Sequence, residues 1–121
     1  MKKRSDPRHL KRIALMQALF SWQFKPGKKP VAKISEVVAN LRRIDKLISQ
    51  SAPDRPLKEI NKVDLAILRL ATFEIILDKG VPPKVSIDEA VELGKEYGSD
   101  SSASFINGAL GKLMEIEGIK T

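Results

Sequence analysis

Cysteine is absent from the 121-residue chain, which excludes disulfide bonds and thiolate metal sites. His9 is the only histidine, so the sequence also excludes a histidine-rich metal site. No apolar run approaches the roughly 18 residues that a membrane-spanning helix needs, and the basic start lacks the apolar segment of a signal peptide. We therefore expect a cytoplasmic protein that holds no metal and no cofactor.

Acidic residues are scarce in the first quarter of the chain. Residues 1–33 carry ten Lys or Arg against one acid, Asp6, a net charge of +9, whereas residues 34–121 carry twelve bases and fourteen acids, a net charge of −2. A localised basic segment favours a polyanionic partner, most often nucleic acid, although a solubilising arm has the same composition. With 42% hydrophobic and 31% charged residues, we expect a single globular domain over residues 1–121, with a basic arm over residues 1–6.

Alternation of apolar and polar residues, the pattern of a strand, is also missing. Apolar residues recur instead with the period of 3.6 that is typical of helices, so the sequence predicts an all-α fold. Asp6 followed by Pro7 is a helix start signal. Capping residues, glycines and prolines predict about six helices, at residues 7–24, 35–52, 57–60, 62–79, 86–98 and 100–118.

Several residues are predicted to shape the helix ends. Asn61 resembles an N-cap with an acid, Asp64, three residues further on, and Ser86 with Glu89 matches a capping box. Gly80 is predicted to adopt the left-handed conformation that ends the helix at residues 62–79. The remaining predictions are a close helix contact at Gly94, a helix stop at Gly98, a cap from Ser99 or Asp100, and a helix end at Gly118.

Candidate catalytic groups do not converge in the sequence. Glu92 and Glu96 share one charged helical face, which we interpret as solvated. His9 lies beside Arg8 and Lys11, so we expect a surface or RNA-facing residue rather than a general base. No phosphate-binding loop is present, because "GKEYGSDSSAS" lacks the GK[ST] ending. We therefore expect no enzymatic activity.

Buried polar and aromatic residues leave alternatives open. Arg69 lies within an apolar helix, and we expect it to pair with Glu74 or Glu89, or to reach the surface with its stem packed. Phe105 is favoured as a core residue, but an aromatic residue beside the loop at residues 98–104 also suits base stacking. Three further aromatic residues are predicted to lie in the core: Phe20, Trp22 and Phe24.

Three segments together resemble the bacterial transcription antitermination factor family NusB. They are "RIALMQALFSWQ", "VDLAILRLATFEI" and "VPPKVSIDEAVELGKEYGSDSSASFINGALGKL", and the resemblance from Asn61 to Leu113 is continuous. It implies two small helical bundles packed together. It also implies binding to boxA leader RNA of ribosomal RNA operons, together with the ribosomal protein NusE, in an RNA polymerase complex that suppresses termination.

The resemblance assigns roles to individual residues. Phe105 in "SFINGAL" matches the aromatic residue of the family that faces RNA, which favours the stacking role for this side chain. Asp64, just before "AILR", matches an acid in the region that meets NusE. The basic start of the first helix, which contacts RNA in the family, corresponds here to Lys3, Arg4, Arg8, Lys11 and Arg12.

The chain also departs from the family pattern. Residues 25–56 form a shorter middle region than in typical members, the segment "SAPDRP" lacks an aromatic residue, and the corner "SDSSAS" is rich in serine. A NusB-like domain also begins some ribosomal RNA cytosine methyltransferases, but no cofactor-binding region follows here, so we expect a free-standing factor. The alternative is a NusB-like protein-interaction or rRNA-processing module without antitermination activity.

Overall fold

The computed structural model describes residues 6–120, and within this range every regular element is helical. Six α-helices are present there: α1 (Pro7–Trp22), α2 (Ser35–Ala39), α3 (Leu41–Ser51), α4 (Lys62–Phe73), α5 (Pro83–Tyr97) and α6 (Ser102–Ile116). Three short turns of helix connect them: η1 (Ala32–Ile34), η2 (Leu57–Glu59) and the π-helical η3 (Glu74–Asp78). The predicted all-α fold is confirmed. None of these helices has the length and apolarity to cross a bilayer.

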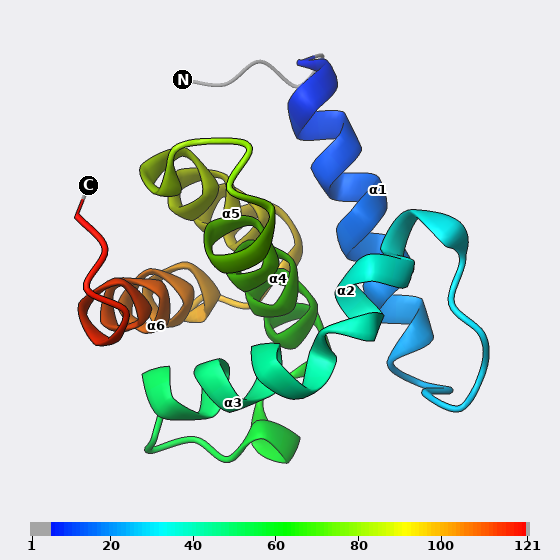
Figure 1. Ribbon diagram of the computed structural model, residues 1–121, viewed down its shortest axis with the longest axis horizontal. Coiled ribbons are helices and arrows are strands. Elements are labelled where there is room, and N and C mark those ends of the chain that lie inside the picture. Colours follow the sequence, from blue (N-terminus) through cyan, green and yellow to red (C-terminus); the bar gives the residue numbers. More distant parts are fainter. Residues whose placement is uncertain (1–5, 121) are drawn as a thin grey trace.

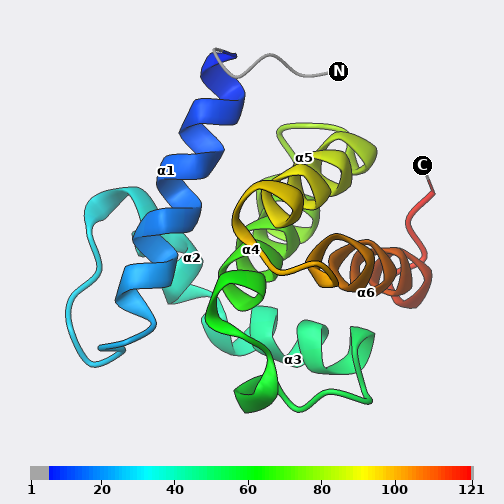
Figure 2. The ribbon, with the colours of Figure 1, turned by 180° about the vertical axis from the view of Figure 1, so that it is seen from behind.

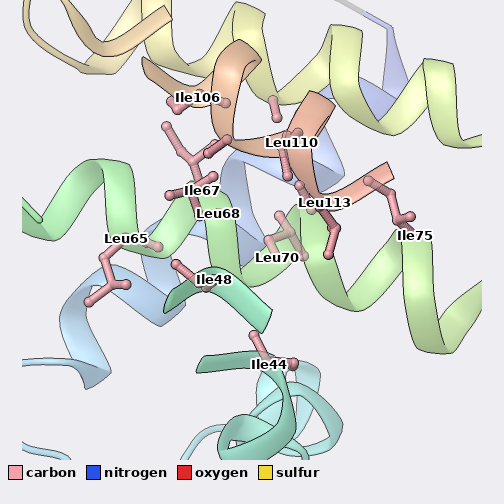
Figure 3. Packing of buried hydrophobic residues seen from close by; sticks show 14 of the residues in the cluster. Ile44, Ile48, Leu65, Ile67, Leu68, Leu70, Ile75, Ile106, Leu110 and Leu113 are labelled. Carbon is pink, nitrogen blue, oxygen red and sulfur yellow. The ribbon is translucent and has the colours of Figure 1, made fainter. Parts of the chain in front are cut away.

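Helix α4 runs through the middle of the molecule, with α1 and α2 on one side and α3, α5 and α6 around the others (Figures 1 and 2). Every residue from position 64 to position 72 of α4 is buried, as its nearly continuous apolar sequence predicts. Leu65, Ile67 and Leu70 of α4 belong to one buried cluster that also includes Ile44 and Ile48 of α3 and Ile106 and Leu110 of α6 (Figure 3). The core therefore surrounds α4, and the other helices each contribute one apolar face.

Helix α1 begins as predicted. The Asp6 side chain accepts a hydrogen bond from the backbone N–H of Arg8 at 2.9 Å, and Pro7 occupies the first turn. This bond from the Arg8 backbone lowers the pKa of Asp6. The helix ends at Trp22, two residues before the predicted end at Phe24.

The predicted second helix is divided into two. The break is at Asn40, whose backbone leaves the helical region (φ −106°, ψ 14°) and whose side chain donates to the carbonyl of Glu36 at 2.8 Å. Asparagine side chains compete in this way with helix hydrogen bonds. The break lets α3 turn beneath α4 instead of continuing along α1 (Figure 1).

At the start of α4, the predicted cap is confirmed, since Asn61 Oδ1 accepts from the backbone N–H of Asp64 at 2.8 Å. At the other end, the backbone N–H of Lys79 donates to the carbonyl of Glu74 at 2.9 Å, closing a π-helical turn. Lys79, with φ 55°, occupies the left-handed position, so the prediction for Gly80 was wrong. The left-handed residue thus lies one position before Gly80.

The predicted capping box at Ser86 and Glu89 was also wrong. Helix α5 begins at Pro83, so Ser86 and Glu89 lie inside the helix and are buried. The sequence signal for this start was the proline pair, because proline suits the first turn of a helix.

The junction of α5 and α6 depends on small residues. A side chain at Gly94 would lie 2.9 Å from Ile106 and 3.4 Å from the Ala103 backbone, which confirms the predicted close contact. Gly98 ends α5 as predicted. The predicted cap from Ser99 or Asp100 was wrong, since Ser101 is the N-cap of α6 and its side chain makes no capping bond. Ser102 Oγ instead accepts from the backbone N–H of Ser99 at 2.9 Å. Gly118, with φ 63°, follows α6 and ends the run as predicted.

Candidate nucleic-acid interface

Two of the predicted RNA-contacting residues lie on the surface of α1. Arg8 and Lys11 are exposed, and the Arg8 side chain is 83% accessible. Both line a hollow of about 520 Å³ between α1, η1–α2 and α4–η3. Lys3 and Arg4, which were predicted to join them, lie outside the described residues. The described part of the basic helix start thus offers two accessible cations.

Arg12, a third predicted RNA contact, points into the protein. Its guanidinium donates to the carboxylate of Glu74, with Nη2 at 2.8 Å and Nε at 3.1 and 3.2 Å from the two oxygens, and Nη1 lies 3.6 Å from Glu89. Burial by itself would lower the pKa of Arg12, but the hydrogen bonds and charge of Glu74 outweigh that effect and raise it. Arg12 is therefore a charged residue of the interior in this structure, held by two carboxylates.

His9 is buried as well, so the expectation of a surface or RNA-facing histidine was wrong. Its side chain is 3% exposed, with Nδ1 at 3.0 Å from Glu89 and Nε2 at 2.7 Å from Glu96. The hydrogen bond to Glu89 is the main reason why the pKa of His9 is raised above its usual 6.5, against the opposite effect of burial. Glu96 consequently faces a histidine and is not only part of a solvated face.

These residues form one buried ion cluster, which we define as His9, Arg12, Glu74, Ser86 and Glu89. Ser86 Oγ of α5 donates to Glu74 Oε1 at 3.0 Å. The carboxylate that Arg12 contacts thus comes from η3 and is also bound by α5. The sequence did contain a signal for this arrangement. His9 and Arg12 continue the 3–4 spacing of the buried residues Met16 and Leu19 of α1 and Gln23 just after it.

Arg69 does not join this cluster, so its predicted pairing with Glu74 or Glu89 was wrong. Its guanidinium forms a two-point ion pair with Asp45 of α3, at 2.9 Å for both bonds, and donates to Gln23 at 3.0 Å. Glu74 lies five positions after Arg69, which is not the three- or four-position spacing of one helical face, and Asp45 of α3 supplies the acid instead. The pair joins α3 to α4.

The aromatic residues are distributed unevenly. Phe20 and Trp22 are partly buried against the core, but Phe24 is 58% exposed, so the prediction of a core position was wrong for Phe24. Its ring lies edge-on to Phe20, with 5.0 Å between the centroids. Phe24 lies two positions after the last residue of α1, in the turn that follows the helix.

Phe105 is partly buried and packs against the core from the first turn of α6. The guanidinium carbon of Arg55 lies 3.9 Å from the centre of its ring, which is cation–π geometry. Both side chains line a hollow of about 370 Å³ between the end of α3 and α6. The ring thus packs against the core and also lies at the rim of a hollow, beside the guanidinium of Arg55.

Asp64, the predicted contact of a protein partner, is only 1% exposed. Its Oδ1 atom has no hydrogen-bond partner within the described part of the chain. The carboxylate lies in the first turn of α4, where the helix dipole stabilises a negative charge. No group of three acidic or histidine side chains in residues 6–120 is arranged to hold a metal ion.

Comparison with known proteins identifies a family. The model of the NusB family matches residues 31–115. The transcription antitermination protein NusB of Alkaliphilus oremlandii is 50% identical over 86 residues, which are 71% of this chain and 62% of that protein. The aligned part of the chain thus spans less than two thirds of this relative. The NusB protein of Thermotoga maritima is 33% identical, over 90% of this chain and 91% of that protein.

Solved structures agree with this match. A crystal structure of T. maritima NusB superposes with a TM-score of 0.78 at 32% identity, covering 95% of this chain and 93% of that one. A chain in a crystal structure of a plectonemic RNA supercoil superposes with a TM-score of 0.79 at 21% identity, covering 94% and 98%. The second likeness concerns the fold alone.

Proposed function

The chain belongs to the NusB family, and on this premise we propose that it is an RNA-binding transcription antitermination factor. In this proposal it binds boxA-type leader RNA of ribosomal RNA operons together with NusE, and the assembly suppresses termination by RNA polymerase. The protein works by holding a polymer in place rather than by catalysing a reaction. The observation that carries the proposal is family membership combined with the exposed basic face of α1.

Two kinds of contact to RNA are proposed. Arg8 and Lys11, exposed on α1, attract the phosphate backbone irrespective of sequence. Phe105 offers a ring at the edge of a hollow for a base that leaves the stack, and Arg55 then lies beside that base. Lys3 and Arg4 are proposed to add to the backbone attraction. Arg12 supports the site by fixing α1, since its guanidinium is bound to Glu74.

NusE is proposed to meet the protein near the start of α4 and along α5. Asp64 marks this region, and its burial means that it supports the surface from below rather than touching the partner. The acids accessible to a basic ribosomal protein include the exposed Asp88 and the partly exposed Glu92, which line a hollow of about 530 Å³ between α5 and α6. Complementary charge of this kind steers association.

Two measurements test the proposal. The first is the mobility shift of a labelled boxA RNA with the full chain alone, with NusE alone and with both. The second is transcription through a terminator downstream of boxA, with and without the chain. We expect a shift that is strongest with both proteins, and increased read-through. A chain that binds NusE but never shifts boxA RNA would instead be the protein-interaction module considered above, and the proposal would be wrong.

A further inference from the structure

A second basic surface lies at the far end of α1 from Arg8. Between Asp6 and Glu36 the chain contains seven lysines and arginines and no acid. Four of these bases are Lys25, Lys28, Lys29 and Lys33, which we call the lysine loop. All four are exposed, and none forms an ion pair with any described residue. Their positive charge is therefore not neutralised within the protein.

Hydrogen bonds connect the backbone of the lysine loop to the end of α1. The indole N–H of Trp22 donates to the carbonyl of Lys28 at 2.9 Å, and the backbone N–H of Lys28 donates to the carbonyl of Lys25 at 3.0 Å. The loop then returns to the body through Ile34, whose side chain is fully buried. A loop that is already ordered loses little conformational entropy when it binds a ligand.

The lysine loop borders a hollow of about 480 Å³ on α1. Its walls include Trp22 and Val31, and no acidic residue lines it. Lys33 lines this hollow and also the hollow that holds Arg8 and Lys11, so the two basic surfaces adjoin each other. At the Arg8 end, the exposed acids Glu36 and Asp78 offset part of the positive charge. The uncompensated charge is therefore largest at the lysine loop.

The two hollows follow one face of α1. Five of the seven α1 residues that line them, together with Lys25 just beyond the helix end, are spaced alternately three and four positions apart, and the other two, Arg12 and Ser21, lie on the same side of the helix. The five residues are Arg8, Lys11, Leu15, Ala18 and Trp22. At a rise of 1.5 Å per residue, the 16 residues of α1 extend over about 24 Å. Cations thus occupy both ends of a track along the helix, and Lys33 lies between them.

We propose that this track is a binding surface for the backbone of single-stranded RNA, with the lysine loop as its second anchor. The inference rests on the proposed function, since Arg8 and Lys11 hold the first part of the strand. RNA fits better than an acidic protein segment because its phosphates are all negative along the strand. The four lysines of the loop are correspondingly all positive. The loop contacts nucleotides that flank the recognised sequence, and it binds them regardless of base identity.

The test uses two probes and two variants of the full chain. The probes are a short boxA RNA and the same RNA extended at either end by about ten uridines, enough to follow a helix of about 24 Å. The loop variant carries Lys25→Gln, Lys28→Gln and Lys29→Gln. The control variant carries Lys46→Gln, Lys84→Gln and Lys120→Gln, which are exposed lysines that line none of the hollows described above. Both variants lose the same net charge.

We expect a uridine extension at one end to tighten binding by the parent chain and by the control variant several-fold. The loop variant should lose this gain, and its plot of log affinity against log salt should be less steep by about 2, for three contacts at about 0.7 each. Affinity for the short RNA should change equally in the two variants. Circular dichroism and thermal melting check that both variants fold.

Other outcomes separate the two proposals. If the extension helps all three proteins equally, or none of them, the lysine loop does not bind RNA, although the proposed function stands as long as the short boxA RNA is bound. If only the extended RNA is bound, and binding depends on the loop, boxA recognition is wrong while the loop inference holds. If neither RNA is bound with or without NusE, both are wrong, and an acidic protein becomes the partner to seek.

Discussion

The Nε2 atom of His9 lies 2.7 Å from Oε1 of Glu96, so the first turn of α1 is tied to the last turn of α5 across 87 positions of sequence. The other ring nitrogen of His9, Nδ1, is hydrogen-bonded to Oε1 of Glu89 at 3.0 Å. The basic helix proposed to hold RNA is thereby fixed, through buried charge, to the helix that leads into α6 and Phe105. The order of α1 and the positions of its exposed cations depend on this contact.

The first prediction concerns pH. The pKa of His9 is raised in the folded protein, chiefly by the hydrogen bond to Glu89, so its contribution to stability is complete below about pH 6.5, the unfolded value, and is lost as pH rises through the folded-state pKa. Urea unfolding of the parent chain and of His9→Gln should be compared from about pH 6 to about pH 9. The parent chain should lose more stability over this range than the variant. Identical pH profiles would show that folding does not raise the pKa of His9.

The second prediction separates two arginines on the same helix. Arg12→Met leaves Glu74 and Glu89 buried without their guanidinium partner, which should lower the free energy of unfolding by about 3–5 kcal/mol. Arg8→Met should change it by less than about 0.5 kcal/mol, because Arg8 is exposed. Arg8→Met should instead flatten the salt dependence of RNA binding by about 0.7. Equal stability losses in the two variants would contradict this division of roles.

The third prediction concerns Phe105. Phe105→Leu keeps an apolar side chain against the core but removes the aromatic face beneath Arg55. RNA affinity should fall by about 1–3 kcal/mol, the range for base–aromatic stacking, with an unchanged salt slope. The melting temperature should fall only slightly. A large loss of stability, with RNA affinity intact in the folded fraction, would assign Phe105 to the core alone.

The fourth prediction compares two glycines. A side chain at Gly98 would collide with the Ser102 side chain and the Gly94 carbonyl, so Gly98→Ala should destabilise the protein and disturb the corner before α6. Gly111 lies inside α6, and nothing lies within 4 Å of the position that an alanine methyl group would occupy, so Gly111→Ala should stabilise the protein by about 0.5–1 kcal/mol. Thermal or urea unfolding of both variants measures the difference. A Gly98→Ala variant as stable as the parent chain would show that the Ser102 contact does not constrain the corner, and a destabilised Gly111→Ala variant would contradict the prediction for α6.

Local signals were enough to predict much of the fold from the sequence. The cap at Asp6 with Pro7, the cap at Asn61, and the close contact at Gly94 each depend on residues near in sequence or on the size of one side chain. The buried α4 followed from its nearly continuous apolar composition. The two caps need no knowledge of how distant segments meet, because their physical cause lies within one turn of helix, and at Gly94 the missing side chain indicates a close contact without naming its partner.

The partners of charged residues could be decided only by tertiary structure. Ser86 and Glu89 match a capping box in sequence, yet they lie inside α5 because the preceding prolines begin the helix earlier. Arg69 pairs with Asp45 because α3 turns beneath α4 after the break at Asn40.

The sequence likewise predicts that His9 and Arg12 are part of a basic surface. In the structure they are buried, because α5 and η3 place three carboxylates around them. The sequence by itself determined which segments are helical and where positive charge is concentrated. The tertiary structure decided which of those charges face solvent, because an ion pair between distant helices depends on packing that no local pattern encodes.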